Sequence, residues 1–275
     1  MTNSLKKLII LLLFLLIGFT VTAGGDFNVI GSREAGMGRS SVALTGFWNI
    51  QNNQAGIALM DKFGVGVYYE SQFTLNQLST KSAAFMAPTG IGVLGITFNH
   101  FGYNLYNDIK IGLVYARSFG RYFRIGLQLD YLQTTLGDNY GSKKNITFEI
   151  GIQSDVTDKL TLGAWVYNPI MVKLADYDNE KIPAIFRFGI AWHIMDGFVA
   201  TVEAEKNTNF QAILIRGGLE YGLKDKFFFR AGFGTQREIF SMGFGFKIKV
   251  LRFDISAVMH ESLGFSPQAS LIFQF

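Results

Sequence analysis

The stretch RIGLQLDY at residues 124–131 decides the fold, because its side chains alternate strictly between apolar and polar. One face receives Ile125, Leu127, Leu129 and Tyr131, and the other receives Arg124, Gly126, Gln128 and Asp130. Successive side chains of a β-strand point to opposite faces, so a period of two predicts a two-faced strand. Residues 145–153 repeat the pattern directly afterwards. The two stretches therefore predict neighbouring strands that separate an apolar from a polar environment.

The same alternation returns along the chain after residue 62, each time followed by a turn. It predicts about fourteen strands, at 63–69, 80–87, 91–99, 110–119, 124–131, 145–153, 160–167, 186–193, 198–205, 211–221, 227–234, 242–249, 251–260 and 268–275. Within 91–99 the phase changes near Val93, which predicts a β-bulge. Short connections alternate with longer ones, which lie at 70–79, 100–107, 135–144, 168–184, 206–210, 235–238 and 261–267. An even strand number with short turns at one end is typical of bacterial outer-membrane barrels, so we predict an all-β fold, a single antiparallel transmembrane β-barrel.

The first 23 residues read as a secretory signal peptide. Lys6 and Lys7 precede an apolar stretch of 12 residues, 8–19, which is too short to cross a bilayer as a helix. Small residues before Gly24 suit a cleavage site. An N-terminal membrane anchor is the alternative. We predict a signal peptide at 1–23, an N-terminal segment at 24–60 and the barrel at 61–275.

Composition excludes several classes of protein. The chain has no cysteine, which rules out disulfides, thiolate metal sites and cysteine nucleophiles. The net charge of +4 includes the two lysines of the signal peptide, and no basic run follows, so nucleic acid is not an expected partner. No cluster has the spacing of metal ligands, and no cofactor is predicted.

Charge decides which face of the strands meets lipid. A lysine or arginine at mid-depth on the lipid side would cost about 2–4 kcal/mol. Seven such residues would outweigh a typical stability of about 5–15 kcal/mol. The charged face must therefore line the lumen, where we predict ion pairs among Arg124, Asp130, Glu149, Arg187, Glu203, Arg216, Glu220, Arg230, Lys247, Arg252 and Asp254, with Glu205 and Lys249 on the same face. Rings near strand ends are predicted to form interfacial girdles on the lipid side: Tyr131, Tyr167, Trp192, Phe198, Tyr221 and Phe227.

Residues 24–60 do not alternate, and they carry two short motifs. The first is GSREAGMG at 31–38, and the second is NQAGIA at 53–58. Together they resemble the opening of the FadL-type fatty-acid transporter superfamily and its PorV/PorQ relatives in type IX secretion, although Gln54 replaces the usual proline and Ile57 the usual leucine. The resemblance implies a fourteen-strand barrel whose N-terminal segment plugs the lumen. It implies the plug residues Arg33, Gly36, Met37, Gly38, Asn53, Ala55 and Gly56.

The plug is also expected on physical grounds, because a barrel of this width leaves a cavity unless something fills it. Arg33 is expected to pair with a lumen carboxylate such as Glu149 or Glu203. An ordinary periplasmic tail is the alternative to a plug.

Three functions are open at this stage. The first is passage of a small hydrophobic solute across the outer membrane, and the second is a non-transporting accessory barrel that binds a secretion-system protein. The third is a barrel enzyme, which is disfavoured because Asp254, Ser256 and His260 lie on one strand rather than on separate elements. In each case the expected location is the outer membrane, in contact with its lipid and with both termini in the periplasm.

Overall fold

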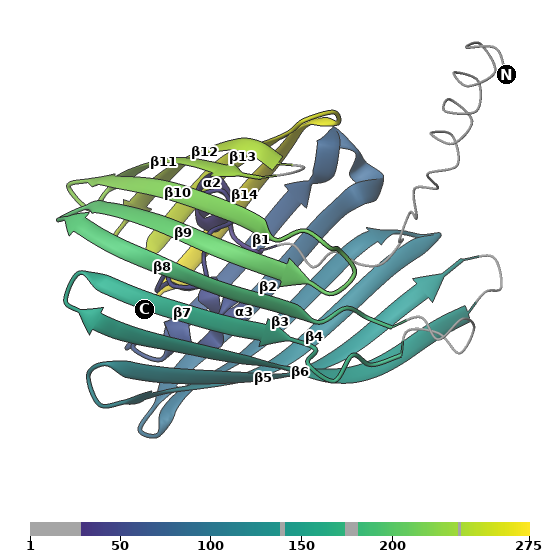
Figure 1. Cartoon of the computed structure of the whole chain (residues 1–275), viewed down its shortest axis with the longest axis horizontal. Coiled ribbons are helices and arrows are strands. Elements are labelled where there is room, and N and C mark those ends of the chain that lie inside the picture. Colours follow the sequence, from purple (N-terminus) through teal and green to yellow (C-terminus); the bar gives the residue numbers. More distant parts are fainter. Residues whose placement is uncertain (1–28, 138–140, 174–180, 236–237) are drawn as a thin grey trace, which may run out of the picture.

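A computed structural model of the chain describes residues 29–137, 141–173, 181–235 and 238–275. Figure 1 shows a barrel of tilted strands with short helices inside it. The predicted signal peptide, residues 1–23, lies outside the described residues, as do residues 24–28 of the predicted N-terminal segment.

Fourteen antiparallel strands close into a barrel in which each strand pairs with its neighbours in sequence. They are β1 (Gly64–Ser71), β2 (Ser79–Thr89), β3 (Gly92–Tyr103), β4 (Tyr106–Phe119), β5 (Phe123–Leu136), β6 (Gly141–Thr157), β7 (Leu160–Tyr167), β8 (Ile185–Met195), β9 (Phe198–Asn207), β10 (Leu214–Leu223), β11 (Phe227–Gly234), β12 (Glu238–Ile248), β13 (Leu251–His260) and β14 (Gly264–Gln274). The barrel closes between β1 and β14, from Gly64 opposite Gln274 to Glu70 opposite Gln268. The predicted single antiparallel β-barrel of fourteen strands is confirmed.

The helical elements are short and lie before β1 or between β1 and β2. They are α2 (Ser32–Gly36), α3 (Asn49–Asn52) and the 3-10 helices η1 (Gln54–Ile57), η2 (Gln72–Thr74) and η3 (Asn76–Leu78). Within the described ranges, no helix combines the length and apolar character needed to cross a membrane.

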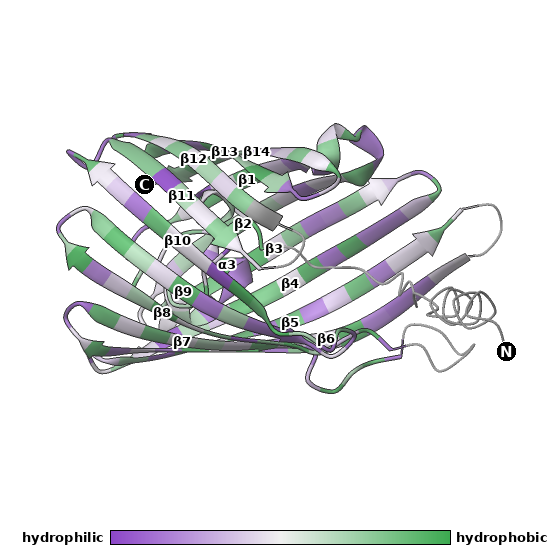
Figure 2. Ribbon diagram, turned by 45° about the horizontal axis from the view of Figure 1, so that its top comes forward, coloured by the Kyte–Doolittle hydropathy of each residue, from purple (hydrophilic) through white to green (hydrophobic). Residues whose placement is uncertain are grey.

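The two faces of the wall differ as the alternation predicts. On β5, Leu129 is 54% exposed on the outer face, whereas its neighbours Gln128 and Asp130 are buried on the inner face. Figure 2 shows this alternation of hydrophobic and hydrophilic residues along the strands. An apolar outer face with a polar inner face is the arrangement that a transmembrane barrel requires.

The predicted bulge in β3 is wrong. Val93 is buried on the lumen side and Leu94 is exposed on the outer side, and the pairing of β3 with both neighbours runs without a register shift. The phase of the sequence changes because the lumen face is itself apolar at this point. Val93 packs there with Ile50 and Ile57 of the N-terminal segment.

Two predicted loops, 100–107 and 135–144, are mostly strand. β3 and β4 continue to a tight connection between Tyr103 and Tyr106, and the β5–β6 ladder extends to the pair Leu136 and Gly141. These strand ends project beyond the rest of the rim at the long-loop end (Figure 1). Their sequences do not alternate because both faces there can be polar, while the backbone ladder continues.

The apolar outer face generates a direct test. We expect Leu129→Lys to destabilise the barrel by about 2–4 kcal/mol, because it places an ammonium group at mid-depth in lipid. Urea titration in lipid vesicles, followed by tryptophan fluorescence, measures the change. The matched control is Gln133→Lys on the same strand and face but near the rim, where the expected cost is about 0–1 kcal/mol. Equal effects of the two substitutions would contradict a lipid-facing wall.

Candidate functional site: the occupied lumen

Residues 29–60, here called the lumen segment, lie inside the barrel (Figure 1). Helix α2 packs against β12 and β13, and η1 packs against β4, β5 and β6. Trp48, the largest side chain of the segment, is 1% exposed. The described part of the predicted plug therefore occupies the lumen and does not form a tail outside the barrel.

Glycines on the inner wall form the seat of the lumen segment. A Cβ atom added to any of them would lie less than 3.0 Å from an atom of the segment: Gly66, Gly95, Gly126, Gly151, Gly163, Gly189, Gly218 and Gly232. They come from eight different strands, so the close approach extends around the lumen. Side chains at these positions would exclude the segment, since residues without a Cβ are needed where two backbones meet.

The first motif of the lumen segment, 31–38, passes close to β10, β11 and β12. Gly36 approaches Gly243 so closely that an added Cβ would lie 3.0 Å from its Cα. Gly38 has a φ of +66° and donates its N–H to the Ser241 hydroxyl at 2.8 Å. The backbone of Met37, which is fully buried, lies against Gly218.

The second motif, 53–58, contacts β5, β6 and β7. Asn53 donates its amide to the carbonyls of Val42 and Ile152, at 2.6 and 3.3 Å. Ala55 is fully buried, and its N–H lies against Gly126. Gly56 touches Asn49 and the carbonyl of Leu44 inside the segment. The residues implied by the resemblance are thus all at contacts within the lumen.

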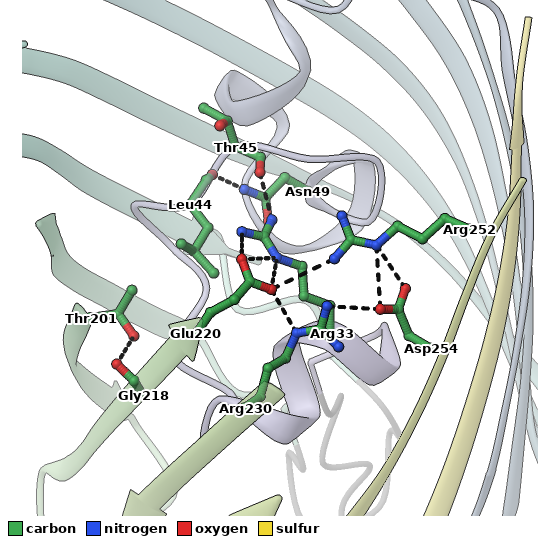
Figure 3. A network of polar contacts seen from close by, with 10 residues as sticks. All are labelled: Arg33, Leu44, Thr45, Asn49, Thr201, Gly218, Glu220, Arg230, Arg252 and Asp254. Carbon is green, nitrogen blue, oxygen red and sulfur yellow. Dashed lines mark hydrogen bonds and ion pairs between the residues drawn. The ribbon is translucent and has the colours of Figure 1, made fainter. Parts of the chain in front are cut away.

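An ion cluster around Glu220 joins the segment to the wall (Figure 3). The Glu220 carboxylate accepts from Arg33 at 2.7 Å and from Arg230 at 2.6 Å. Arg230 and Arg252 also bind Asp254, at 2.8 and 3.0 Å. Arg33 therefore pairs with Glu220, and neither expected partner, Glu149 or Glu203, contacts it within the described residues.

Burial affects the two charged residues of α2 in different ways. It disfavours the charged form of Arg33, yet the Glu220 carboxylate more than offsets this and raises the Arg33 pKa above its ordinary value. Burial raises the pKa of Glu34 to about 7, with Arg33 opposing the shift. Neutral Glu34 therefore adds no full negative charge to the Glu220 cluster at acidic pH.

Glu149 is the centre of a second cluster. It accepts from Lys110 at 2.7 Å, from the Gln54 amide at 2.5 Å and from the Trp165 indole at 3.1 Å. Asp130 joins through Gln128, whose amide donates to both carboxylates. Gln54, which departs from the family motif, is therefore a direct link between the segment and the wall.

Glu203 and Glu205 form a third cluster with arginines of the wall. Glu203 accepts the backbone N–H groups of Ser41 and Val42 at 2.7 and 2.8 Å. Arg187 and Arg216 both bind Glu205, at 2.6 and 2.9 Å. A wall carboxylate thus fixes the segment through its backbone, which sequence reasoning had no means of detecting.

Sequence reasoning also missed an ion pair between Arg39 and Glu70. The two side chains meet at 2.6 Å and are buried, and the Tyr68 hydroxyl donates to the same carboxylate at 3.0 Å. Glu70 follows the alternation of β1 on the lumen side, which was the available signal.

Three predicted residues lie elsewhere than expected. Arg124 pairs with Asp155 at 2.6 Å, near the short turns and apart from the segment. Lys247 is exposed near the end of β12, and no ion-pair partner for it occurs in the described ranges. Tyr167 is wrongly assigned to a lipid-side girdle: it is fully buried on the lumen side and stacks on Trp165, because Leu160, Leu162 and Val166 take the outer face of β7.

The residues considered for catalysis or metal binding have other partners. Ser256 donates to Gln268 at 2.8 Å, and Asp254 binds arginines. His260 accepts two backbone N–H groups in the β13–β14 turn. Across the part of the chain that the structure describes, no three His, Asp or Glu side chains gather as metal ligands would.

The glycine seat can be tested with one substitution. Gly232→Val should displace the lumen segment, because its Cβ would collide with the backbone of Met37 and Gly38. A Ser41→Cys reporter, introduced into the cysteine-free chain, should then react faster with a maleimide. Gly90→Val is the matched control, since nothing lies within 4 Å of its Cβ position. Unchanged labelling in the Gly232 variant would contradict the close approach.

The Glu220 cluster can be tested by a double-mutant cycle. Glu220→Gln leaves three arginines facing a single Asp254 carboxylate, so we expect a loss of about 3–5 kcal/mol in unfolding free energy. Adding Arg33→Gln should cost clearly less in that variant than in the original chain, with a coupling above about 0.5 kcal/mol. Guanidinium unfolding in detergent supplies the values. Additive losses would show that Arg33 and Glu220 are not coupled.

No family model and no curated protein matches the chain. Solved structures with a similar fold do exist. The CymD monoaromatic hydrocarbon channel and the Ralstonia pickettii toluene transporter TbuX each have a TM-score of 0.66 at 13% identity, over 90% of this chain and 98% of theirs. A Pseudomonas aeruginosa FadL homologue has a TM-score of 0.64 at 12% identity, over 92% and 98%. At such low identity the likeness shows the fold, which is the FadL-type barrel, and the PorV/PorQ part of the resemblance is not among these matches.

Proposed function

We propose that the chain is an outer-membrane channel for small hydrophobic solutes, in which the lumen segment acts as the plug. The observation that carries the proposal is the seat of that segment, which contacts strands all around a barrel that is apolar outside. In this proposal residues 1–23 are the removed signal peptide, 24–60 the plug and 61–275 the barrel. Both termini lie on the periplasmic side with the short turns.

The lumen carries an apolar surface that suits such a solute. Leu132, Trp165, Tyr167, Ile182 and Ile185 form a buried cluster on and above the wall. They pack against the apolar residues of the lumen segment at positions 37 and 42–44. Displacement of that part of the segment would offer aromatic and aliphatic contacts to an incoming molecule. The similar structures are named for aromatic hydrocarbons and toluene, which supports the same class of solute here.

Solute uptake tests the proposal. Gram-negative cells that produce the chain should take up radiolabelled toluene faster than cells with an empty vector, while uptake of arabinose stays unchanged. Equal toluene uptake in the two strains would contradict a channel for hydrophobic solutes. Increased arabinose uptake would contradict a plugged lumen, because a small sugar needs an open aqueous pore.

A reversible lock distinguishes a plug that moves from one that stays in place. A Cβ on Gly189 would lie 2.7 Å from Cγ1 of Val42, close enough for a disulfide between cysteines at these two positions. We expect the oxidised Val42→Cys/Gly189→Cys variant to lose toluene uptake and to regain it after reduction. Each single cysteine variant is a control that cannot form the bond. Full uptake in the oxidised form would show that this part of the segment does not need to move.

The second candidate is a non-transporting accessory barrel. Three ion or hydrogen-bond clusters fix the segment to the wall, through Arg33, Arg39 and the backbone at Ser41. Such cross-linking suits a permanently filled lumen whose loops bind a protein, for example of a secretion system. Absence of toluene uptake together with a stoichiometric protein partner in native membranes would favour this candidate.

A further inference from the structure

Charged strand residues are distributed unequally between the two faces of the wall. Where side chains are described, the acidic strand residues all lie on the lumen side: Glu70, Asp108, Asp130, Glu149, Asp155, Glu203, Glu205, Glu220 and Asp254. The outer face next to the long loops instead carries Lys81, His100, Lys144 and Lys206. Among the described strand residues, the outer face at that end therefore has cations and an imidazole but no carboxylate.

Three of these residues form a row across neighbouring strands. Lys81 on β2 lies opposite His100 on β3, and the register continues through Ile109 and Gln133 to Lys144 on β6. Cross-strand neighbours have Cβ atoms about 5 Å apart. Lys144 lies three strands from His100, which is about 14 Å at the usual strand spacing.

The row marks the edge of the apolar band. On each strand the outward residue just below it is apolar: Ala83 below Lys81, Phe98 below His100 and Ile146 below Lys144. Long lysine side chains at such an edge extend their ammonium groups into the headgroup region. The row is therefore positioned to meet headgroups rather than acyl chains.

Avoidance of buried charge does not explain the sign of the row. Aspartate and glutamate cost less than lysine or arginine on the lipid face of a barrel, and near the interface all of them cost little. In the described ranges the ammonium groups of Lys81 and Lys144 have no ion-pair or hydrogen-bond partner. Lys206 differs, because it donates to the carbonyls of Phe210 and Gln211 at 2.6 Å, and we leave it out of the site.

We propose that the row of Lys81, His100 and Lys144 binds the headgroup of a phosphorylated glycolipid in the leaflet next to the long loops. The inference rests on the proposed function, which places the long loops outside the cell, where the outer leaflet consists of such lipid. Two phosphates on one headgroup match two lysines separated by several strands better than a single phosphate does. Gln133, between His100 and Lys144, supplies a neutral hydrogen-bonding group.

Native mass spectrometry of the full chain, extracted from Gram-negative outer membranes in mild detergent, tests the proposal. We expect the original chain to retain one diphosphorylated glycolipid. Lys81→Gln/Lys144→Gln should bind purified lipid A roughly thirtyfold more weakly, since each lysine near an anionic lipid surface contributes about fivefold. Phosphatidylglycerol, tested in parallel, should bind more weakly than lipid A to the original chain.

Arg117→Gln is the matched control, because Arg117 is an exposed residue on the outer face of β4 near the short turns. This variant should bind lipid A like the original chain. Equal lipid A binding by the double lysine variant would overturn the site, and equal affinity for phosphatidylglycerol would overturn the choice of glycolipid. Heat-modifiable migration in gels confirms that each variant is folded. Toluene uptake is measured separately, so failure of the channel proposal is distinguishable from failure of the lipid site.

Discussion

The structure depends on one constraint, which is that backbone N–H and C=O groups inside a bilayer have no water to bind. An open sheet would leave its edge groups unsatisfied, so the sheet must close upon itself. Here β1 completes the wall by pairing with β14 along seven residue pairs, from Gly64 to Glu70. Closure at fourteen strands fixes a circumference too large for inward side chains alone to fill. The lumen segment is the consequence, because a wide lumen needs additional chain to occupy it.

The inner wall accommodates this segment in two ways. Where the segment backbone lies against a strand, the wall has glycine, as at Gly232 beneath Gly38. Where side chains meet, charged groups of the wall and of the segment neutralise each other, as in Arg39 with Glu70. Buried charges are tolerable only when they are paired and hydrogen-bonded. The segment and the wall are therefore complementary in both shape and charge.

The strands were predictable from the sequence because lipid and lumen impose a period of two on every crossing. The prediction failed where that rule lapses: Val93 and Tyr167 are apolar or aromatic yet face the lumen, because the segment covers them or packs nearby. Candidate residues of the segment could be selected by motif, but their partners could not. Arg33 pairs with Glu220 rather than Glu149 or Glu203 because the path of the segment around the lumen depends on distant glycines.

The same complementarity limits how the segment can move. Full expulsion would leave Glu70, Glu203 and Glu220 without the groups that the segment supplies, and breaking each buried ion pair costs about 3–5 kcal/mol. Several such losses together would rival the stability of a whole domain, about 5–15 kcal/mol. A local shift near Val42 and Leu44 breaks fewer polar contacts and uncovers the apolar cluster around Trp165. Local displacement is therefore the cheaper route, and it opens the part of the lumen that a hydrophobic solute can wet.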